Sequence, residues 1–485
     1  MSFEVVFTAE ADSISNEHLL QHYKRNVFQE DLCFALWRPS TGEYRRTALI
    51  WEVILPHQDE RSLHGNASFQ PSYVTRAIQM ARQRGAGLAF MHSHPGPGWQ
   101  GMSAADVDAE RDALAYPAAA TGLPLVGLTI GSDGYWSARF WERNGTEMHR
   151  SWCEKVRVVG PKSYRIDFND DLVPPPLRRE ILRRTFDTWG RQSQNTISRL
   201  RVGIVGLGSV GCIVAETMAR VGVEQVTLID PDKVERHNLD RLLYGTVKDI
   251  GKLKVETAMG AMRRNATAQN IQVSIYPVSL QDMTAYKAAL DCDILFSCVD
   301  RPLPRDVLNY ISQAHLIPVI DGGVEVETHR QDDCLFSAHW RAHIVTPYHQ
   351  CLRCNGQYNS SAVVMELDGS LDAPSYVSNL PAEERFRNQN VFPFSESVAA
   401  MEVNLMLRYL LAADWWPVVG QQDYQFVTGE TRVINEECHP NCSFRERRAL
   451  GDTENPFYLI ERAEGSPKVG WRGWVRMLDR VLRRS

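Results

Sequence analysis

The sequence predicts an α/β protein made of two joined domains. The chain has 485 residues, and domains usually hold about 100–200 residues, so more than one independent core is expected. Strand-like apolar runs alternate with amphipathic stretches along most of the chain, which is the pattern of helices crossing over a sheet. A glycine-rich turn, VGIVGLGSVG at 202–211, follows one of these runs and is typical of a doubly wound, Rossmann-like sheet.

The composition is that of an ordinary globular protein. Apolar residues make up 44% of the chain and charged residues 23%, which argues against long disordered or fibrous segments. The net charge of −6 is mildly acidic, so bulk charge does not draw the chain to nucleic acid or lipid. The N-terminus shows no secretory signal, and no uncharged apolar stretch approaches about 18 residues, so we expect a cytoplasmic protein with no membrane span.

Shifts in composition divide the chain into four segments. Residues 1–160 form the first predicted domain, and 161–179 form a connection stiffened by three consecutive prolines. Residues 180–450 form the second domain, which contains the glycine-rich turn. The tail, 451–485, ends in a basic amphipathic helix that carries two tryptophans on its apolar face.

The segment HSHPGPGWQGMSAAD at 92–106 has the pattern of a metal site. His92 and His94 are two apart at the end of a strand, so both imidazoles leave the same face and can bind one zinc ion. Ser103 is the expected N-cap of the next helix and places Asp106 in its first turn, as a third ligand. Two His, one Asp and an open position suit a catalytic zinc, although S-x-x-D alone is often only a capping box.

The ordered set H-x-H-P, glycine turn and S-x-x-D resembles the JAB/JAMM (MPN) zinc metalloproteases, which cleave after the C-terminal glycine of ubiquitin-like proteins. The resemblance implies an α/β zinc hydrolase fold for 1–160, oxyanion stabilisation by Ser103, and a general base on an early strand. Glu30 fits that base, with Cys33 where the family usually has glycine, and Glu52 is the weaker candidate. Eight residues rather than the usual seven separate His94 from Ser103, so a first domain that has lost its zinc and serves as a scaffold remains an alternative.

The glycine-rich turn predicts a nucleotide site in the second domain. Gly206, Gly208 and Gly211 link a buried strand to a helix, where backbone N–H groups can hold phosphates. Asp230 stands at the end of the next strand, which an NAD-dependent oxidoreductase would also show. The polar residues that follow instead suit a triphosphate with magnesium, and they are Asp232, Asn238, Arg241 and Lys254.

The pattern D-x-D-x-V-x-x-x-N-L-x-R, followed by G-x-x-K, resembles the ThiF/MoeB and ubiquitin-activating superfamily over about 180–445. That resemblance implies ATP-dependent adenylation of a C-terminal carboxylate and a homodimer. It assigns ribose binding to Asp230, magnesium to Asp300, and triphosphate binding to Asn238, Arg241 and Lys254, with Arg241 and Asp300 as the catalytic residues. Arg305 matches the family's arginine after that aspartate, and Arg183 or Arg184 would reach the nucleotide of the partner copy.

Two cysteine pairs predict a structural zinc site. Cys351 and Cys354, and Cys438 and Cys442, have the close spacing of zinc thiolates, with His439 as a spare ligand. The ThiF family has a similar site. No cysteine lies between 355 and 437, where activating enzymes that form a thioester keep one, so a thioester is expected only weakly, with Cys334 as its exposed candidate.

Together these resemblances imply a bifunctional enzyme that acts on the C-terminal glycine of a ubiquitin-like protein. The first domain would trim or release the tail with zinc, the second would adenylate it with ATP and magnesium, and a conjugating enzyme is a further possible partner. Fusion would raise the effective concentration of one step's product for the next. A bacterial conjugation pathway, with a role in defence, is implied, and sulfur-carrier activation for cofactor or cysteine biosynthesis is the alternative.

Overall fold

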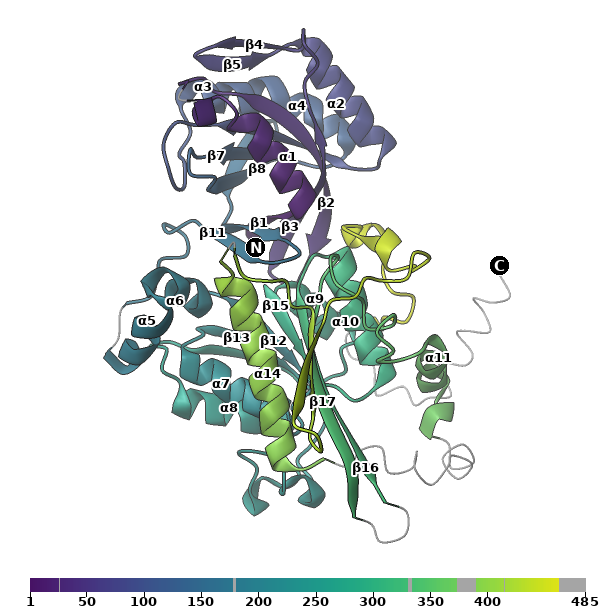
Figure 1. The fold of residues 1–485 in the computed structure, drawn as a ribbon. Helices are drawn as coiled ribbons and strands as arrows, with labels where there is room; N and C mark the ends of the chain where they lie inside the picture. Colours follow the sequence, from purple (N-terminus) through teal and green to yellow (C-terminus); the bar gives the residue numbers. More distant parts are fainter. Residues whose placement is uncertain (26, 178–179, 330–333, 373–389, 414, 462–485) are drawn as a thin grey trace.

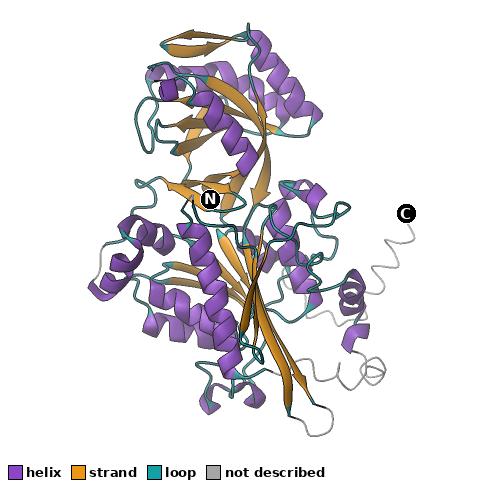
Figure 2. Ribbon diagram, in the orientation of Figure 1, coloured by secondary structure: helices purple, strands orange, loops and turns teal. Residues whose placement is uncertain are grey.

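The computed structural model describes residues 1–485 apart from 26, 178–179, 330–333, 373–389, 414 and 462–485. Two α/β domains are stacked along the long axis of the molecule (Figures 1 and 2). The predicted C-terminal amphipathic helix lies outside the described residues. Among the helices that are described, none is both long and apolar enough to cross a membrane.

The first domain is built on a nine-stranded mixed sheet with the order β11-β10-β1-β3-β2-β6-β7-β8-β9. Helix α1 packs on one face, and α2 with a π-helical segment packs on part of the other. Its strands are β1 (Ser2–Thr8), β2 (Leu32–Thr41), β3 (Arg45–Ile54), β6 (Gly87–Ser93), β7 (Leu125–Ile130), β8 (Trp136–Asn144), β9 (Glu147–Trp152), β10 (Lys155–Val159) and β11 (Tyr164–Phe168), with the separate hairpin β4 (Arg61–His64) and β5 (Asn66–Phe69). Its helices are α1 (Ala9–Leu19), α2 (Pro71–Gln83), α3 (Ala104–Asp108), the π-helical segment Ala109–Ala115 and α4 (Tyr116–Ala118).

Helix α2 illustrates why the sequence folds in this way. Proline stands at its first turn, where its missing N–H costs nothing. Its buried residues recur at helical spacing on one face, and they are Tyr73, Val74, Ala77 and Ala81. That face closes over β2 and β6, whose buried side chains lie beneath it.

Part of the predicted connection 161–179 belongs to the first sheet. Tyr164–Phe168 form β11, which pairs antiparallel with β10 as Val159↔Tyr164 through Lys155↔Phe168. The alternating sequence YRIDF explains the strand, because its apolar side chains are buried on one face. The connection therefore begins after Phe168 rather than at residue 161.

The second domain is an eight-stranded sheet with helices on both faces and the order β14-β13-β12-β15-β16-β17-β18-β19. The first five strands in that order are parallel, and the last three join antiparallel. The strands are β12 (Arg201–Val205), β13 (Gln225–Ile229), β14 (Gln272–Tyr276), β15 (Ile294–Ser297), β16 (Val319–Thr328), β17 (Leu335–Val345), β18 (Gln421–Gln425) and β19 (Glu430–Ile434). The helices are α5 (Arg183–Trp189), α6 (Arg191–Ser198), α7 (Gly211–Val221), α8 (Lys254–Asn265), α9 (Met283–Leu290), α10 (Pro302–Ala314), α11 (Ser360–Asp368) and α14 (Phe392–Leu411).

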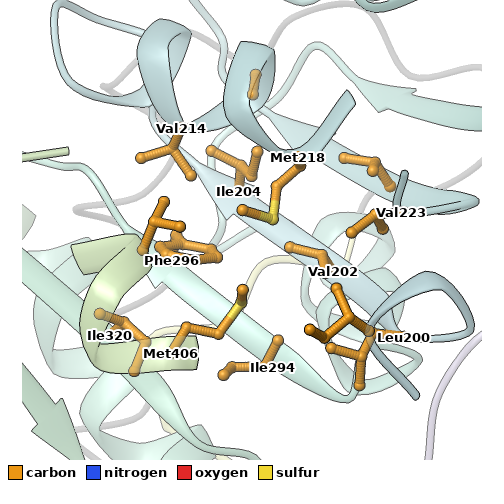
Figure 3. Close-up of a cluster of buried hydrophobic side chains, with 14 of the residues drawn as sticks. Leu200, Val202, Ile204, Val214, Met218, Val223, Ile294, Phe296, Ile320 and Met406 are labelled. Atoms are coloured by element: carbon orange, nitrogen blue, oxygen red, sulfur yellow. The ribbon is translucent and has the colours of Figure 1, made fainter. Parts of the chain in front are cut away.

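The core of this domain lies between the parallel strands and the helices α7 and α14. Figure 3 shows Met218 of α7 and Met406 of α14 directed toward Ile204, Ile294 and Phe296 of the sheet. The opposite face of the same strands packs on α9 and α10. Because both faces are covered, the central parallel strands β12 and β15 carry mostly apolar residues, as the sequence predicts for a doubly wound sheet.

The two domains share a buried ionic cluster. Asp293, which directly precedes β15, lies 2.8 Å from Arg45 Nη1 and 2.5 Å from Lys155 Nζ of the first domain. Glu4 pairs with the same Arg45 and with Arg157, and all of these side chains are buried. The carboxylates neutralise buried cations, which would be costly to bury without a partner. Because Asp293 and the cations come from different domains, this cluster couples the domains.

We expect Asp293→Ala to lower the free energy of unfolding by about 3–5 kcal/mol, because it leaves Arg45 and Lys155 buried without their shared partner. Burial opposes the ionised form of Asp293, but the nearby cations lower its pKa below the ordinary value, so its contribution to stability is lost as the pH falls through the acid range. Denaturant melts of the full chain measure the change. Asp112→Ala, at an exposed site, is the control expected to leave stability unchanged, and equal melts for both variants would contradict the role of the cluster.

Candidate functional site

The three predicted zinc ligands converge at the end of β6. His92 Nε2 lies 3.2 Å from His94 Nε2 and 3.4 Å from Asp106 Oδ1, and His94 Nε2 lies 3.3 Å from Asp106 Oδ2. Their ligand atoms all fall within 4.8 Å of one another. Two imidazoles and a carboxylate directed at one point form a donor set that fits zinc.

The loop of eight residues between His94 and Ser103 does not displace this group. Ser103 caps α3: its Oγ accepts from Asp106 N at 3.2 Å, while Ser103 N donates to Asp106 Oδ2 at 2.7 Å. The capping box therefore fixes the carboxylate that faces the two imidazoles. Oxyanion stabilisation by Ser103 remains a prediction.

Electrostatics favour a cation between these side chains. Burial lowers the pKa of His92 to about 3, with the nearby charge of Arg139 adding to the effect, so its ring is neutral at physiological pH. Burial opposes ionisation of Asp106, yet hydrogen bonding to His94 and to Ser103 holds its pKa below the ordinary range. Neutral imidazoles and an ionised carboxylate are the protonation states that bind zinc.

Of the two candidate bases, the structure places Glu30 near these ligands. Burial raises the pKa of Glu30, and the charges of His94 and Asp106 act on it in opposite directions, so the three groups are within electrostatic range. Glu52 lies further away, because it pairs with Leu36 of β2, whereas His92 pairs with Leu32. The stretch of β2 from Leu32 to Leu36 is about 13 Å long.

A buried carboxylate that sequence reasoning did not single out anchors the segment carrying Glu30. Asp31 Oδ1 lies 2.7 Å from Arg61 Nη1 of β4, and Gln21 Nε2 donates to Asp31 Oδ2 at 3.0 Å. Asp31 N in turn donates to Ser93 Oγ, between the two histidines. Nothing in the local sequence distinguishes Asp31 from a surface acid, because its partners come from distant segments.

The glycine-rich turn lies at the switch point of the second sheet. Strand β12 pairs with β13 on one side and with β15 on the other, so the chain leaves β12 in one direction and later returns on the opposite side. Crevices at such points, beyond the carboxyl ends of the strands, are where doubly wound sheets bind ligands. The turn leads directly into α7, whose first N–H groups face that crevice.

Glycine occupies the three positions of the turn for different structural reasons. Gly206 has φ +87°, and a Cβ there would lie 2.4 Å from Cys298 O. A Cβ at Gly211 would lie 1.9 Å from Gly206 O, so both positions require glycine. A Cβ at Gly208 would meet no atom within 4 Å, so glycine there leaves open space above the turn.

Asp230 and Lys254 lie beside this turn. Asp230 is buried, and its carboxylate accepts from Leu207 N at 2.6 Å and from Asp232 N at 2.7 Å, so it holds the turn itself. Burial raises its pKa. Lys254 Nζ donates to Asp232 Oδ2 at 2.8 Å. Ribose binding by Asp230, which the sequence resemblance implies, remains a prediction.

The other residues predicted to bind the nucleotide lie in the segments that follow β13 and β15. Asn238 Oδ1 accepts from Glu235 N, and Arg241 Nη1 donates to His237 O at 2.7 Å. Asp300 is exposed and comes three residues after β15, at the same edge as the glycine turn. Arg305 is held in α10, where its Nε lies 3.3 Å from the buried Asp321.

The four cysteines of the two predicted pairs form a single cluster. Their sulfur atoms lie within 4.8 Å of one another, and Cys351 Sγ is 3.7 Å from Cys442 Sγ. Backbone N–H groups of Cys351 and Cys354 donate to sulfurs of the cluster. Four thiols at this spacing fit a closed structural zinc, which would join the turn after β17 to the segment after β19.

We expect Cys351→Ser combined with Cys442→Ser to remove zinc and unfold the end of the second domain, because structural zinc contributes about 10–16 kcal/mol in small zinc domains. Zinc content and the thermal melt of the full chain measure this. The exposed Cys334→Ser serves as the control and should leave both unchanged. A melting curve unmoved by the double substitution would show that these thiols are not ligands.

Residues predicted to act in trans or as nucleophiles are exposed. Arg183 and Arg184 begin α5, where both side chains are accessible to another copy. Cys334 is exposed near the start of β17. A dimer and a thioester both remain predictions.

Comparison with known proteins matches the second domain. A family model described as "ThiF family" matches residues 181–443. The Escherichia coli molybdopterin-synthase adenylyltransferase is 35% identical over 146 residues, covering 30% of this chain and 56% of that protein. An adenylyltransferase and sulfurtransferase of Meyerozyma guilliermondii is 28% identical over 187 residues, covering 36% and 43%. The chain thus spans about half the length of these curated relatives. A crystal structure of E. coli MccB aligns at 19% identity with a TM-score of 0.43, covering 55% of this chain and 75% of that one.

Proposed function

This chain belongs to the ThiF family, and we propose that its second domain uses ATP to adenylate a C-terminal carboxylate. The observation that carries the proposal is the glycine turn at the switch point, with Lys254, Arg241 and Asp300 at the same edge of the sheet. The relatives by sequence are adenylyltransferases. Because one of them is also a sulfurtransferase and another acts on molybdopterin synthase, a glycine-ending sulfur carrier is favoured over a protein of a conjugation pathway.

The arrangement of residues accounts for the chemistry. A carboxylate oxygen of the tail attacks the α-phosphorus of ATP, the bond from that phosphorus to the bridging oxygen breaks, and pyrophosphate leaves. The N–H groups of the turn and α7 would hold the phosphates, while Lys254 and Arg241 offset the charge that develops. Asp300 would hold magnesium, which neutralises charge on the leaving pyrophosphate. Catalysis then rests on position and charge rather than on a covalent residue.

ATP–pyrophosphate exchange tests this proposal. Labelled pyrophosphate should enter ATP only when a glycine-ending ubiquitin-like or sulfur-carrier protein is added, because that carboxylate is needed to form the reversible adenylate. Small proteins of this type from the source genome are the probes. Exchange that proceeds equally without any such protein, or with one lacking its last glycine, would overturn the assignment.

A second activity, zinc-dependent cleavage after such a tail, is favoured by the geometry of His92, His94 and Asp106, with Glu30 two residues before Leu32, which pairs with His92. The family match lies wholly outside the first domain, so this proposal depends on the donor set alone. Zinc, when bound there, supplies Lewis-acid chemistry and makes a coordinated water acidic near neutral pH. Glu30 would accept a proton from water and return it to the leaving amine as the C–N bond breaks and the water oxygen joins the carbonyl carbon. A first domain without zinc, serving as a scaffold, is the alternative.

A further inference from the structure

We infer that the two candidate sites lie far apart on opposite sides of the domain interface, so that a ubiquitin-like protein docked at one cannot present its tail to the other. The inference rests on both proposed activities. It means that a tail trimmed by the first domain must leave the protein before the second domain activates it.

Strand β2 separates the first site from the domain interface. Its first residue, Leu32, pairs with His92, so its start lies at the candidate zinc site. At its other end Ser40 Oγ lies 2.8 Å from His315 Nδ1 and Thr41 N donates to Asp452, and both of these partners belong to the second domain or its tail. From Leu32 to Thr41 the strand spans about 30 Å.

The strands of the second domain continue away from the same interface. Asp293, in the buried ionic cluster, directly precedes β15. The backbone N of Arg201, which begins β12, donates to this same Asp293. Both strands therefore start at the first domain and end at the glycine turn and Asp300, which adds about 13 Å for β15 alone.

From the domain interface, β2 leads back to the candidate zinc site, whereas β12 and β15 lead away to the glycine turn on the other side. In Figure 1, α3 and the β4–β5 hairpin lie at one end of the molecule, while α7 and α8 lie beyond the interface toward the other. Laid end to end, β2 and β15 span about 40 Å, so the sites lie far apart. An extended chain covers at most about 3.3–3.6 Å per residue, so a tail would need about 12 free residues to span the distance.

Fusion therefore does not raise the effective concentration of a trimmed tail at the adenylating site of the same chain, as the sequence alone suggested. Effective concentration falls to nothing when a tether cannot span two sites. Each domain must instead provide its own docking surface for the body of the ubiquitin-like protein. Between the two steps the trimmed protein mixes with the pool in solution.

Isotope dilution tests this consequence. The probe is the protein that supports ATP–pyrophosphate exchange, isotopically labelled and given a short extension after its last glycine. It is mixed with the wild-type chain, ATP and an excess of the same protein unlabelled and already trimmed. We expect the labelled fraction of the adenylate, read by mass spectrometry, to equal that of the free trimmed pool. A labelled fraction several-fold above the pool would show direct transfer, within or between chains, and would overturn the inference.

Two further measurements separate failure of the inference from failure of the proposed function. Trimming without ATP, and exchange with the trimmed protein, are measured alone, and loss of either defeats the proposed function itself.

The separation is also measured without any protein partner, by pulsed electron resonance between Cu²⁺ at His92, His94 and Asp106 and a spin-labelled ATP. A distance near 40 Å is expected and should vanish in His92→Ala, whereas one below about 20 Å, within reach of six extended residues, would contradict the inference.

Discussion

Asp300→Ala is expected to reduce ATP–pyrophosphate exchange by about 10²–10³-fold, the cost of removing one preorganised charge-stabilising group, or to background. Asp300 is the exposed carboxylate that follows β15 at the carboxyl edge of the sheet, next to the glycine turn. Asp300 is the carboxylate that we propose would hold magnesium against the leaving pyrophosphate. The zinc content and melting of the chain should stay the same, because the Asp300 side chain is exposed.

Asp112→Ala is a suitable control, because that side chain is exposed in the first domain and pairs with Arg111. It should leave exchange unchanged. If Asp300→Ala supports exchange at the wild-type rate, the site assignment at the switch point is wrong.

Glu30→Gln should reduce cleavage of an extended tail by about 10²–10⁴-fold, the usual cost of losing a general base. The amide keeps the size of the side chain but cannot accept a proton from water. Zinc should remain bound, because Glu30 is not among the converging ligand atoms. Cleavage rates and metal content of the same preparations separate these two effects.

His92→Ala and Asp106→Ala should instead lose both the metal and the activity, since each removes one of three protein ligands. Glu52→Gln is the matched control, as Glu52 lies further along the sheet beside Arg84. If Glu52→Gln abolishes cleavage and Glu30→Gln does not, the base is misassigned. If the purified chain holds no zinc at the histidines, the scaffold alternative is correct.

The sequence predicted the parts of the fold and sites that depend on short segments. The glycine turn between β12 and α7 follows from local chemistry, since Gly206 has φ +87° and a Cβ at Gly211 would lie 1.9 Å from Gly206 O. The cysteine pairs and the His92–His94 pattern are likewise local, and the structure brings each group together. The family match confirms the ThiF-type second domain, whereas adenylation by it and the activity of the first domain remain proposals.

What the sequence could not predict depends on contacts between distant segments. Asp293 resembles any acid before a strand, yet it is buried against Arg45 and Lys155 from another domain. Asp31 is buried by partners on α1, β4 and the loop after α1. The separation of the two sites also follows only from which strand ends meet at the interface. Such pairings depend on tertiary packing, which leaves no short motif.

Intact mass spectrometry of a glycine-ending partner, after incubation with this chain, ATP and magnesium, tests the central claim of adenylation most directly. We expect the partner to gain the mass of AMP at its C-terminal glycine, and to gain nothing when that glycine is deleted or ATP is omitted. A partner that supports exchange but never carries AMP would contradict the proposed reaction, as would a chain that binds NAD in preference to ATP.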